Sequence, residues 1–519
     1  MSRTNLQTRL RQIASKMKSR LIRGIGRSRN EQQARHLFAA LQWVTAHSIL
    51  KQGIRISNRQ ISSYPEVTGY FIPTLLQYGE LEFAVALGQW LVQIQNQDGS
   101  WSEPAGGIPY TFDTGQVLKG LVAILPRLPE VEPAIRRGCN WLLTQIQSSG
   151  RVTTPDKGEW QLPHGELISE NIHLYALEPL RQAGAYFQET RYTEACERAL
   201  AYYLQQTDLT AFNTLSHFHA YVLEALVDLG YPALAAQGMS HIELLQRRDG
   251  AVPAYPDVNW VCATGIAQYA VIWYKLGQRE RAQKALEYLC KIQNSSGGFY
   301  DGYGRGANYF PDEEISWAIK FFLDAYYWHI RTTFDAQAAL WPDTISANDG
   351  QFQAILQGLG DLSGLRVLDA GCGKGRFAKA LLTTYASAEI WGVDLSDAML
   401  GYVPPAIKTR QGSLVNLPFK DGYFDHAYCV EAIEHSIKPE TAIAELCRVV
   451  KPGGRIIVVD KNEEKHGALE IEAWEQWFKR SEVETWLGRY CVDVRSLFTP
   501  YEDTIEPDGL FITWQGTRR

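Results

Sequence analysis

The stretch VLDAGCGKGRF, residues 367–377, ends an apolar run and sets Gly371, Gly373 and Gly375 at alternate positions before a helical pattern begins. Glycine lets a backbone turn sharply and approach a bound group closely. Asp369 stands two positions before the first glycine, at the end of the apolar run. A strand, a glycine loop and a helix in this order predict a nucleotide-type cofactor site, for which nicotinamide cofactors are an open alternative.

Short apolar strands alternate with helices on both sides of this loop, which predicts a doubly wound, Rossmann-like α/β domain with a mainly parallel sheet over residues 351–519. Asp394 ends the next strand, 25 residues after Asp369, where an acid can accept both hydroxyls of a ribose. Residues 333–350 are predicted to be a linker. The predicted strands are RVLDAG (366–371), IWGVDLS (390–396), HAYCVEAI (426–433), RIIVVDK (455–461) and two later candidates at 490–498 and 510–516.

Residues 365–465 resemble class I S-adenosylmethionine-dependent methyltransferases, particularly the large type 11 group. The resemblance is carried by the glycine loop and then, in order, by WGVDLSDAML, LPFKDGYFD, EAIEHS and ELCRVVKPGGRIIVVD. It implies S-adenosylmethionine as cofactor and methyl transfer as the reaction. It also implies the cofactor contacts: the methionine part meets Asp369, Gly371, Gly373 and Gly375, the ribose meets Asp394, and the adenine borders Leu395, Ser396 and Met399. Ser413 stands where the family usually has Asp, so the adenine amino group is left to Ser413 or to the backbone of Leu414.

The stretch YCVEAIEHS, residues 428–436, contains three candidate catalytic residues: Glu431, Glu434 and His435. On a helix this spacing would place all three on one face. Two interpretations stay open. His435 can serve as a metal-free base that takes the proton of an acceptor hydroxyl. Alternatively, as a resemblance to small-RNA 2′-O-methyltransferases and ubiquinone-pathway O-methyltransferases implies, the three residues bind Mg²⁺ or Mn²⁺, with His466 as a fourth ligand.

Residues 34–332 repeat a helical pattern with a period near 50 residues. Four copies of an aromatic or aliphatic helix end contain Gln and lead into a Gly-containing loop: WLVQIQNQDGSW (90–101), WLLTQIQSSG (141–150), IELLQRRDG (242–250) and YLCKIQNSSGGFY (288–300). Helical hairpins of this size bury their apolar faces by stacking on neighbours, so six hairpins predict a closed α/α toroid. The arrangement resembles the six-hairpin barrels of terpene cyclases, protein prenyltransferases, glycoside hydrolases, polysaccharide lyases and glucuronyl C5-epimerases.

Polar residues gather near the first turns of the second helix of each hairpin, which predicts a carbohydrate pocket at one rim of the toroid. Capping of helix N-termini is the alternative explanation for the acids among them. D-x-D-D and D-D-x-x-D runs are missing from the sequence, which argues against cationic terpene cyclisation. The candidate pocket residues are Tyr64, Glu66, Tyr110, Asp113, Glu170, His173, His217, His219, Glu313 and Glu314.

Composition narrows the class of protein further. The chain has 519 residues, 45% of them hydrophobic and 21% charged, and a net charge of −6. Residues 1–33 form a basic, amphipathic arm, and its first 30 residues hold nine Lys/Arg and no Asp/Glu, so the remainder is acidic and nucleic acid is not expected as a partner. The arm predicts peripheral contact with an anionic membrane surface through residues 1–30. Eight scattered cysteines without a C-x-x-C pair predict a reduced, cytoplasmic protein.

These patterns together predict a methyltransferase that O-methylates a sugar hydroxyl of a glycan or glycoconjugate, with a toroid that binds or processes the same substrate. The glycan part rests on analogy with other toroids and on the polar, tyrosine-rich first turns. Three alternatives stay open. The toroid can be a second enzyme such as a lyase or an epimerase, it can be a non-catalytic binding module, or the acceptor can be a terpenoid, another lipid or a different small molecule.

Overall fold

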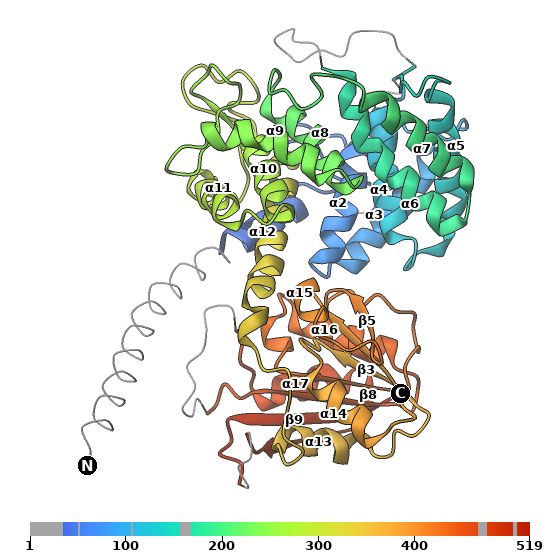
Figure 1. The fold of residues 1–519 in the computed structure, drawn as a ribbon, viewed down its shortest axis with the longest axis vertical. Coiled ribbons are helices and arrows are strands. Elements are labelled where there is room, and N and C mark those ends of the chain that lie inside the picture. Colours follow the sequence, from blue (N-terminus) through green and yellow to red (C-terminus); the bar gives the residue numbers. More distant parts are fainter. Residues whose placement is uncertain (1–34, 50–51, 105–106, 156–167, 466–474, 502–505) are drawn as a thin grey trace, which may run out of the picture. The chain divides into compact units, whose positions relative to one another are not determined.

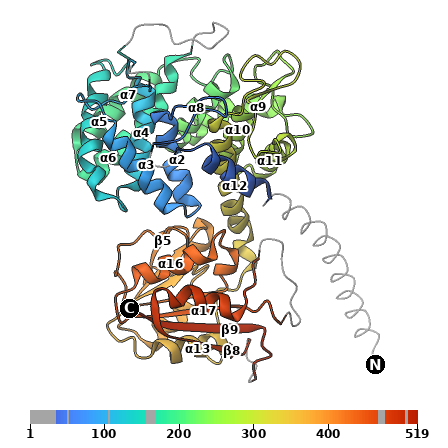
Figure 2. The same cartoon turned by 180° about the vertical axis from the view of Figure 1, so that it is seen from behind.

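The computed structural model of the chain (Figures 1 and 2) describes residues 35–49, 52–104, 107–155, 168–465, 475–501 and 506–519. These residues form two compact units, His36–Thr332 and Thr333–Arg519. The predicted basic arm, residues 1–33, lies outside the described residues. Among the helices described, none combines the length and the apolar character needed to cross a bilayer.

The N-terminal unit consists of two sets of helices that differ in burial. Eleven of the thirteen residues of the inner helix α2 are buried, whereas the outer helix α3 buries the single stripe Ala84, Leu87, Gly88 and Leu91. The inner set is α2 (Pro65–Gln77), α4 (Thr111–Ile124), η2 (Glu170–Ala176) continued by α6 (Leu177–Phe187), α8 (Ser216–Asp228), α10 (Ala263–Lys275) and α12 (Ser316–Gln337). The outer set is the helix at 35–46, α3 (Leu81–Gln93), α5 (Glu132–Gln145), α7 (Thr190–Tyr203), α9 (Pro232–Leu245) and α11 (Arg279–Ile292).

The inner helices form a closed ring. Contacts run from α2 to α4, η2, α8 and α10 in turn. Helix α12 completes the circle, because Asp324 accepts a hydrogen bond of 2.6 Å from Thr74 of α2 and His329 lies 3.0 Å from the hydroxyl of Tyr274 of α10. The predicted α/α toroid of six helical hairpins is therefore confirmed for the described residues. Short elements connect some hairpins: η1 (Pro129–Val131), β1 (Val261–Cys262) and β2 (Gly302–Tyr303).

The repeated Gln and Gly residues join each outer helix to the next. The side-chain amide of Gln95 donates to the carbonyl of Gly99 in its own loop and to that of Ala134 in α5, both at 2.9 Å. Gly99 has a φ of +99°, and a Cβ there would lie 2.5 Å from the carbonyl oxygen of Arg137. The repeat therefore predicts architecture correctly, and the residues that made it recognisable are used in packing.

The last repeat docks onto the first outer helix by the same contacts. Gln293 donates to the carbonyl of Gly297 at 2.9 Å and to the carbonyl of His36 at 3.0 Å. A Cβ on Gly297, which has a φ of +90°, would overlap the carbonyl oxygen of Ala39. These contacts form the seam of the toroid, which we define as residues 36–39 and 293–297.

The C-terminal unit is a seven-stranded sheet in the order β5-β4-β3-β6-β7-β9-β8. Strands β3 to β7 are parallel, and β9 pairs antiparallel with both β7 and β8. Two apolar cores cover its faces. This confirms the predicted Rossmann-like domain. The strands are β3 (Arg366–Ala370), β4 (Glu389–Asp394), β5 (Lys408–Gln411), β6 (His426–Val430), β7 (Arg455–Lys461), β8 (Cys491–Thr499) and β9 (Phe511–Arg518). The helices are α13 (Gly350–Leu359), α14 (Arg376–Thr384), α15 (Asp397–Leu400), α16 (Pro439–Val449) and α17 (Arg480–Gly488), with the short turns η3 (Ala338–Leu340) and η4 (Ile433–His435).

Residues 333–350, which were predicted to be a linker, include helical elements. Helix α12 continues to Gln337, η3 follows directly, and α13 begins at Gly350. Asp349 caps α13 by accepting the backbone N–H groups of Gln351 and Phe352 at 2.9 and 3.0 Å. The sequence pattern misses this because the aromatic residues of the segment pack on the C-terminal unit, a long-range contact that local composition does not encode.

Candidate active site

The glycine loop lies at the carboxyl end of β3, where Gly371, Gly373 and Gly375 all take positive φ values of +75°, +52° and +72°. Side chains other than glycine strongly disfavour this region. The carboxylate of Asp394, at the end of β4, accepts the N–H of Gly373 at 2.8 Å and that of Ser396 at 2.9 Å. The predicted ribose acid therefore also fixes the shape of the loop.

The loop offers an open cradle beside a buried acid. A Cβ built on Gly373 would meet nothing within 4 Å, so there is room above the loop. Asp369 is 2% exposed, and its Oδ2 has no hydrogen-bond partner among the described residues. Burial raises the pKa of Asp369 to about 7. The hydroxyl of Tyr428 on β6 also interacts with this carboxyl group. Because an unpartnered buried oxygen is costly, Oδ2 of Asp369 fits a site whose ligand donates a hydrogen bond.

The predicted adenine side is organised by a residue that sequence analysis missed. Asp335, in the last turn of α12, accepts the hydroxyl of Ser396 at 2.6 Å and the N–H of Ala398 at 3.2 Å. The hydroxyl of Ser396 in turn accepts the N–H of Met399 at 3.1 Å and caps α15. The carbonyl of Leu395 accepts from Gln411 at 3.2 Å.

Ser413 and Leu414 lie in the turn that follows β5. Ser413 is bridged to Asn416, and its hydroxyl accepts the N–H of Val415 at 3.4 Å. The side chain of Leu414 reaches the start of the glycine loop, because a Cβ on Gly371 would lie 3.9 Å from its Cδ1. Both residues therefore sit at the loop edge, and their proposed contact with adenine stays a prediction.

Other residues of the segment 333–350 pack against the candidate catalytic residues. Lys374, inside the glycine loop, donates to the carbonyl of Trp341 at 2.8 Å and lies 4.2 Å from the ring centre of Tyr402. The ring of Trp341 lies edge-on to His435 at 6.4 Å, and that of Phe334 at 5.4 Å. Two aromatic side chains from 333–350 thus wall in the imidazole.

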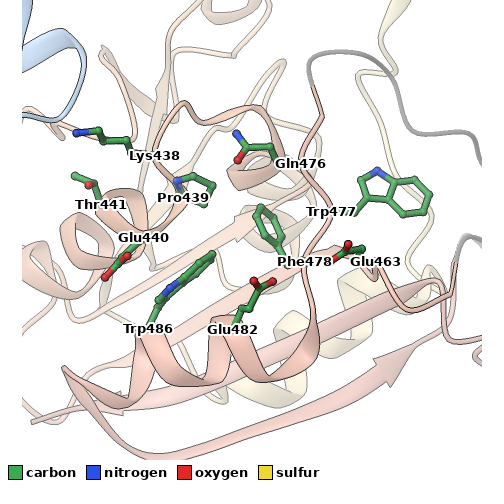
Figure 3. Close-up of a pocket in the computed structure, with 10 residues that line it drawn as sticks. All are labelled: Lys438, Pro439, Glu440, Thr441, Glu463, Gln476, Trp477, Phe478, Glu482 and Trp486. Atoms are coloured by element: carbon green, nitrogen blue, oxygen red, sulfur yellow. The ribbon is translucent and has the colours of Figure 1, made fainter. Parts of the chain in front are cut away.

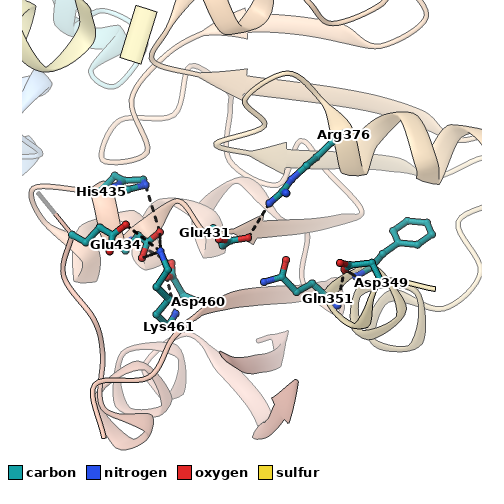
Figure 4. A network of polar contacts seen from close by, with 10 residues as sticks. Asp349, Gln351, Arg376, Glu431, Glu434, His435, Asp460 and Lys461 are labelled. Atoms are coloured by element: carbon teal, nitrogen blue, oxygen red, sulfur yellow. Dashed lines mark hydrogen bonds and ion pairs between the residues drawn. The ribbon is translucent and has the colours of Figure 1, made fainter. Parts of the chain in front are cut away.

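The stretch around Glu431, Glu434 and His435 does not form the helical face that its spacing suggested. Glu431 follows β6 with a φ of +47°, and Glu434 and His435 lie in the single turn η4. Figure 4 shows the two glutamates held by different cations. Glu431 accepts from Arg376, the first residue of α14, at 2.8 Å. The prediction of one converging face is wrong, because the end of a parallel strand, not a helix, presents these residues.

Glu434 is held in a buried ionic network. Its side chain is 1% exposed, and its two carboxylate oxygens lie 2.6 and 2.7 Å from the ammonium of Lys461 on β7. The same ammonium lies 3.2 Å from Glu475, whose other oxygen accepts the indole N–H of Trp477 at 3.0 Å. Lys461, Glu475 and Trp477 were not predicted, since they come from strands and turns distant in sequence.

His435 is the member of the network with free hydrogen-bonding capacity. Its Nε2 lies 3.5 Å from Oε1 of Glu434, beyond ordinary hydrogen-bonding distance. Both ring nitrogens are buried and have no hydrogen-bond partner among the described residues. Burial lowers the pKa of His435 to about 4, so the imidazole is neutral near pH 7 and can accept a proton.

The residues that could bind a metal differ from the predicted set. Among the described residues, Glu434, His435 and Glu475 bring potential ligand atoms within 4.8 Å of one another. Glu431 is outside this set, and His466 lies outside the described residues. The ammonium of Lys461 already occupies the position between the two carboxylates. The donor set as arranged therefore does not fit a divalent cation, and the metal stays a prediction.

Gln476 and Trp477 also line an open pocket of about 700 Å³ (Figure 3). Glu440 in its wall is paired with Arg489, and Glu482 caps α17 by accepting the N–H of Lys479. Gln476 ties this wall to η4 through its N–H to the carbonyl of Glu434 at 2.9 Å. The pocket is lined by Lys438, Pro439, Glu440, Thr441, Glu463, Gln476, Trp477, Phe478, Glu482 and Trp486.

In the toroid, several of the predicted pocket residues lie at the N-terminal ends of the inner helices. The hydroxyl of Tyr64 donates to Asp113 at 2.9 Å, and Glu66 lies in the first turn of the neighbouring helix with 8% exposure. His217 lies 2.7 Å from Gln268, and its ring centre is 4.6 Å from that of Tyr221.

Other predicted pocket residues serve the scaffold. Glu170 pairs with Arg151 at 2.8 Å, and His219 lies between the hydroxyl of Tyr269 and the carbonyl of Thr210 at 2.8 and 3.1 Å. Glu313 accepts from Ser57. The capping alternative, which concerned the acids, does not describe Glu170 and Glu313, because their carboxylates bond to side chains of other segments.

Glu314, His173 and Tyr110 complete the predicted set. Glu314 accepts the indole N–H of Trp43 at 2.6 Å and the amide of Asn294 at 2.8 Å, which ties α12 to the outer layer. His173 is buried in η2, and neither of its ring nitrogens has a hydrogen-bond partner in the described part of the chain. Tyr110 is the N-cap residue of α4.

The C-terminal unit has the sheet order of a Rossmann-like methyltransferase fold, with a glycine cradle beside Asp394. Residues 368–458 match the family model described as a methyltransferase domain (Methyltransf_11). The donor and acceptor groups around the loop fit S-adenosylmethionine; that Asp369 and the glycines meet its methionine part and Asp394 its ribose stays a prediction.

Two of the sequence relatives are named as O-methyltransferases. The chain is 28% identical over 199 residues to a ubiquinone biosynthesis O-methyltransferase of Alkalilimnicola ehrlichii, covering 33% of this chain and 80% of that protein. It is 31% identical over 111 residues to the O-methyltransferase cnsE of Penicillium expansum, covering 20% of this chain but 40% of that protein. The crystal structure of an unsaturated glucuronyl hydrolase specific for heparin aligns with 59% of this chain and 98% of its own, at 16% identity and a TM-score of 0.47.

Proposed function

We propose that the protein is an S-adenosylmethionine-dependent O-methyltransferase whose acceptor is a sugar hydroxyl of a glycan or glycoconjugate. The observation that carries the O-methylation is His435, a neutral imidazole whose nitrogens have no hydrogen-bond partner among the described residues. It is linked to the cofactor loop through Trp341 and Lys374.

The chain's own residues would divide the reaction between alignment and proton transfer. When bound, S-adenosylmethionine supplies a methyl group activated on a sulfonium, so the protein mainly aligns acceptor and methyl. Asp394, which holds the loop, would also bind the ribose of the cofactor. Because Oε1 of Glu434 faces Nε2 of His435, Nδ1 is left to take the proton of the acceptor hydroxyl. Lys461 keeps Glu434 in place beside the imidazolium that then forms.

The sugar part of the proposal is supported by the interior of the toroid. A ring lined mainly by aromatic and apolar residues would favour a lipid, whereas converging Glu, His and Tyr side chains would favour a sugar. Aromatic rings such as Tyr221 and Phe321 are present here, and we give more weight to the polar groups of Tyr64, Asp113 and His217 beside them. Carboxylate, phenol and imidazole groups beside aromatic faces suit a hydroxyl-rich ring, since such sites combine apolar walls with a few placed polar groups.

A second candidate acceptor is a phenol or quinol. The aromatic walls that Phe334 and Trp341 form beside His435 favour it, and the Alkalilimnicola relative is named for ubiquinone biosynthesis. In this case the same base and the same cofactor residues would act, and the toroid would serve another step.

Transfer of tritiated methyl groups to two sets of acceptors tests both candidates. We expect transfer to methyl hexosides or hexuronosides but not to hydroquinone or catechol. His435→Ala should lower the rate at least about 100-fold, the usual contribution of a general base, while cofactor affinity measured by calorimetry stays unchanged. His426→Gln, a histidine at the far end of β6 whose Nδ1 accepts the N–H of Arg455, is the matched control.

Transfer to hydroquinone alone would replace the sugar by a phenol and keep the O-methyltransferase. A fully active His435→Ala variant would contradict the role of His435 as the base.

We also propose that residues 1–30 attach the protein peripherally to anionic membranes. Their nine Lys/Arg without a single Asp/Glu support this, because clustered basic residues gain about 1 kcal/mol each near an anionic lipid surface. The placement fits a cytoplasmic enzyme whose glycoconjugate acceptor carries a lipid.

A further inference from the structure

Two buried carboxyl groups in the toroid are not used by the scaffold. Glu66 and Asp113 occupy the first turns of the adjacent inner helices α2 and α4, with 8% and 5% exposure. In the described part of the chain, Asp113 accepts a hydrogen bond from Tyr64, and the carboxyl group of Glu66 makes none. Neither acid caps its helix. Acids that are this deeply buried are normally paired with a cation or fully hydrogen-bonded.

Unpaired polar side chains lie on the same helix faces, one turn farther into the ring. Gln116 of α4 follows Asp113 by three positions and is fully buried, and neither of its side-chain polar atoms has a partner among the described residues. Tyr70 of α2 follows Glu66 by four positions, and its buried hydroxyl interacts with Ser316 but makes no hydrogen bond of ordinary geometry among the described residues. Residues three or four apart share a helix face, so these groups face the same interior as the two acids.

The opposite side of this interior is aromatic. The ring of Phe321 lies 6.3 Å from that of Tyr70 and 6.4 Å from that of His217, so it joins the two sides. Trp317 stacks on His217 at 6.2 Å with an interplanar angle of 12°. Its indole N–H donates to Asp301 at 2.7 Å, which fixes the ring while leaving it partly exposed. A fixed indole can serve as a platform for a sugar ring.

Charges deeper in the ring are paired, in contrast to the two acids. Lys275 lies 3.0 Å from Glu224 and 2.8 Å from Asp228, and Lys320 lies 2.7 Å from Asp324. The cost of burying these charged groups is therefore compensated by ion pairs. Neither Glu66 nor Asp113 has an ion pair within 4.0 Å among the described residues, and the charge of Lys320 reaches Glu66 only from farther away. Two buried acids without a close cation are the expected pattern for a ligand site.

We propose that Glu66 and Asp113 are the acid and the base of a second active site, which hydrolyses a glycosidic bond. The proposal rests on the sugar chemistry proposed above and adds a separate reaction. Glu66 gives its proton to the glycosidic oxygen as the bond between that oxygen and the anomeric carbon breaks. Asp113 takes a proton from water as the water oxygen bonds to the anomeric carbon.

The environment of each acid supports this assignment of roles. Burial raises the pKa of Asp113 to about 7, and the hydrogen bond from Tyr64 counteracts part of this shift by favouring the ionised form, so Asp113 titrates near the neutral pH at which a base works best. Glu66 lacks such a donor, and burial raises its pKa well above the ordinary range, which favours the protonated form that an acid requires. Tyr64 acts through Asp113 and is a positioning residue.

The test uses the full-length protein and 4-nitrophenyl glycosides of hexoses, N-acetylhexosamines and hexuronic acids. We expect nitrophenol release from at least one of them. Glu66→Gln and Asp113→Asn should each lower kcat at least about 100-fold, and Tyr64→Phe should shift the basic limb of the pH profile. Glu170→Gln, in the first turn of the next inner helix and paired with Arg151, is the matched control and should retain activity. Thermal unfolding and cofactor binding show that each variant is folded.

Three results would overturn the proposal: no release from any glycoside, release that both amide variants retain, or a product with the ultraviolet absorbance of an unsaturated sugar, which marks elimination. Methyl transfer is measured on the same samples. Glycoside cleavage without methylation of sugars would contradict the proposed acceptor and leave the acid–base pair standing, and the converse result would do the reverse.

Discussion

One carboxylate at the end of β4 has two tasks. Asp394 holds the backbone of the glycine loop through Gly373, and we predict that it also accepts the ribose hydroxyls. Asp394→Ala should therefore weaken S-adenosylmethionine binding by about 1.5–3 kcal/mol, the range for lost hydrogen bonds to a charged group. Calorimetry measures the affinity directly. Glu389→Gln, at the other end of the same strand, should bind normally, and equal affinities in both variants would contradict the assignment.

Lys461 supplies the positive charge between Glu434 and Glu475. We therefore expect methyl transfer to survive thorough EDTA treatment. Lys461→Met should lose about 3–5 kcal/mol of stability, because two buried acids lose their cation, and added Mg²⁺ should raise the melting temperature of this variant more than that of the wild type. Lys451→Met removes an exposed pair with Asp425 and is the control. Loss of wild-type activity in EDTA, restored by Mg²⁺, would establish the metal instead.

Asp113 makes the stability of the toroid depend on pH. Burial raises its pKa to about 7 in the folded protein, against about 3.9 in an unfolded chain. The folded state thus binds more protons between these values, so stability falls as the pH rises from about 4 to about 7. Asp113→Asn removes this contribution and should melt higher than the wild type at pH 8 but not at pH 4. Melting curves at both values decide it, and an unchanged difference would contradict the shift.

Among individual site residues, the sequence predicted those that are neighbours along the chain. Asp369, Gly371 and Gly373 were found because a strand, its terminal acid and its loop are contiguous. Asp335 and Lys461 were not, because each reaches the site from an element that is distant in sequence, and neither carries a motif.

The contact between α2 and α4 depends on glycine. A Cβ on Gly120 would overlap the carbonyl oxygen of Gly69, so the two backbones cannot stay in contact with a larger residue there. Gly120→Ala should therefore lower the melting temperature, although alanine is intrinsically about 1 kcal/mol better than glycine in a helix. Gly88→Ala in the outer helix α3, where the nearest atoms are flexible side-chain ends of Leu128 and Ile124 at 3.2 and 3.4 Å, should be neutral or stabilising. Equal effects would contradict the packing argument.

Whole elements were predicted well where periodicity determines them, and badly where tertiary contacts do. The helical hairpins and the alternating strands follow from apolar spacing. The spacing of Glu431, Glu434 and His435 fits a helix equally well, yet β6 ends at Val430 and Glu431 takes a positive φ. A strand that must pair with its neighbours in the sheet outweighs the local preference of five residues.

The charge of the whole molecule is divided unevenly along the chain. The basic residues 1–30 precede an otherwise acidic protein, so we expect cosedimentation with anionic vesicles at low salt and its loss as salt screens the charge. Deleting residues 1–30 should abolish binding while glycoside and methyl-transfer activities stay unchanged. Neutral phosphatidylcholine vesicles are the control. Failure of the full-length protein to bind anionic vesicles at low salt would refute the membrane role.

The seam of the toroid also determines when the ring can form during synthesis. Gln293 bonds to His36 across 257 positions of the chain, and a ribosome adding about 5–20 residues per second needs roughly 13–50 s to make that stretch. A linear stack of hairpins can fold as it emerges, but this ring stays open until its last repeat appears. The first outer helix therefore waits for tens of seconds with its docking edge uncovered, and closure over so long a loop is slow. Newly made chains would depend on chaperones during this interval, and substitutions at residues 36–39 or 293–297 would lower yield more than they lower the stability of the finished ring.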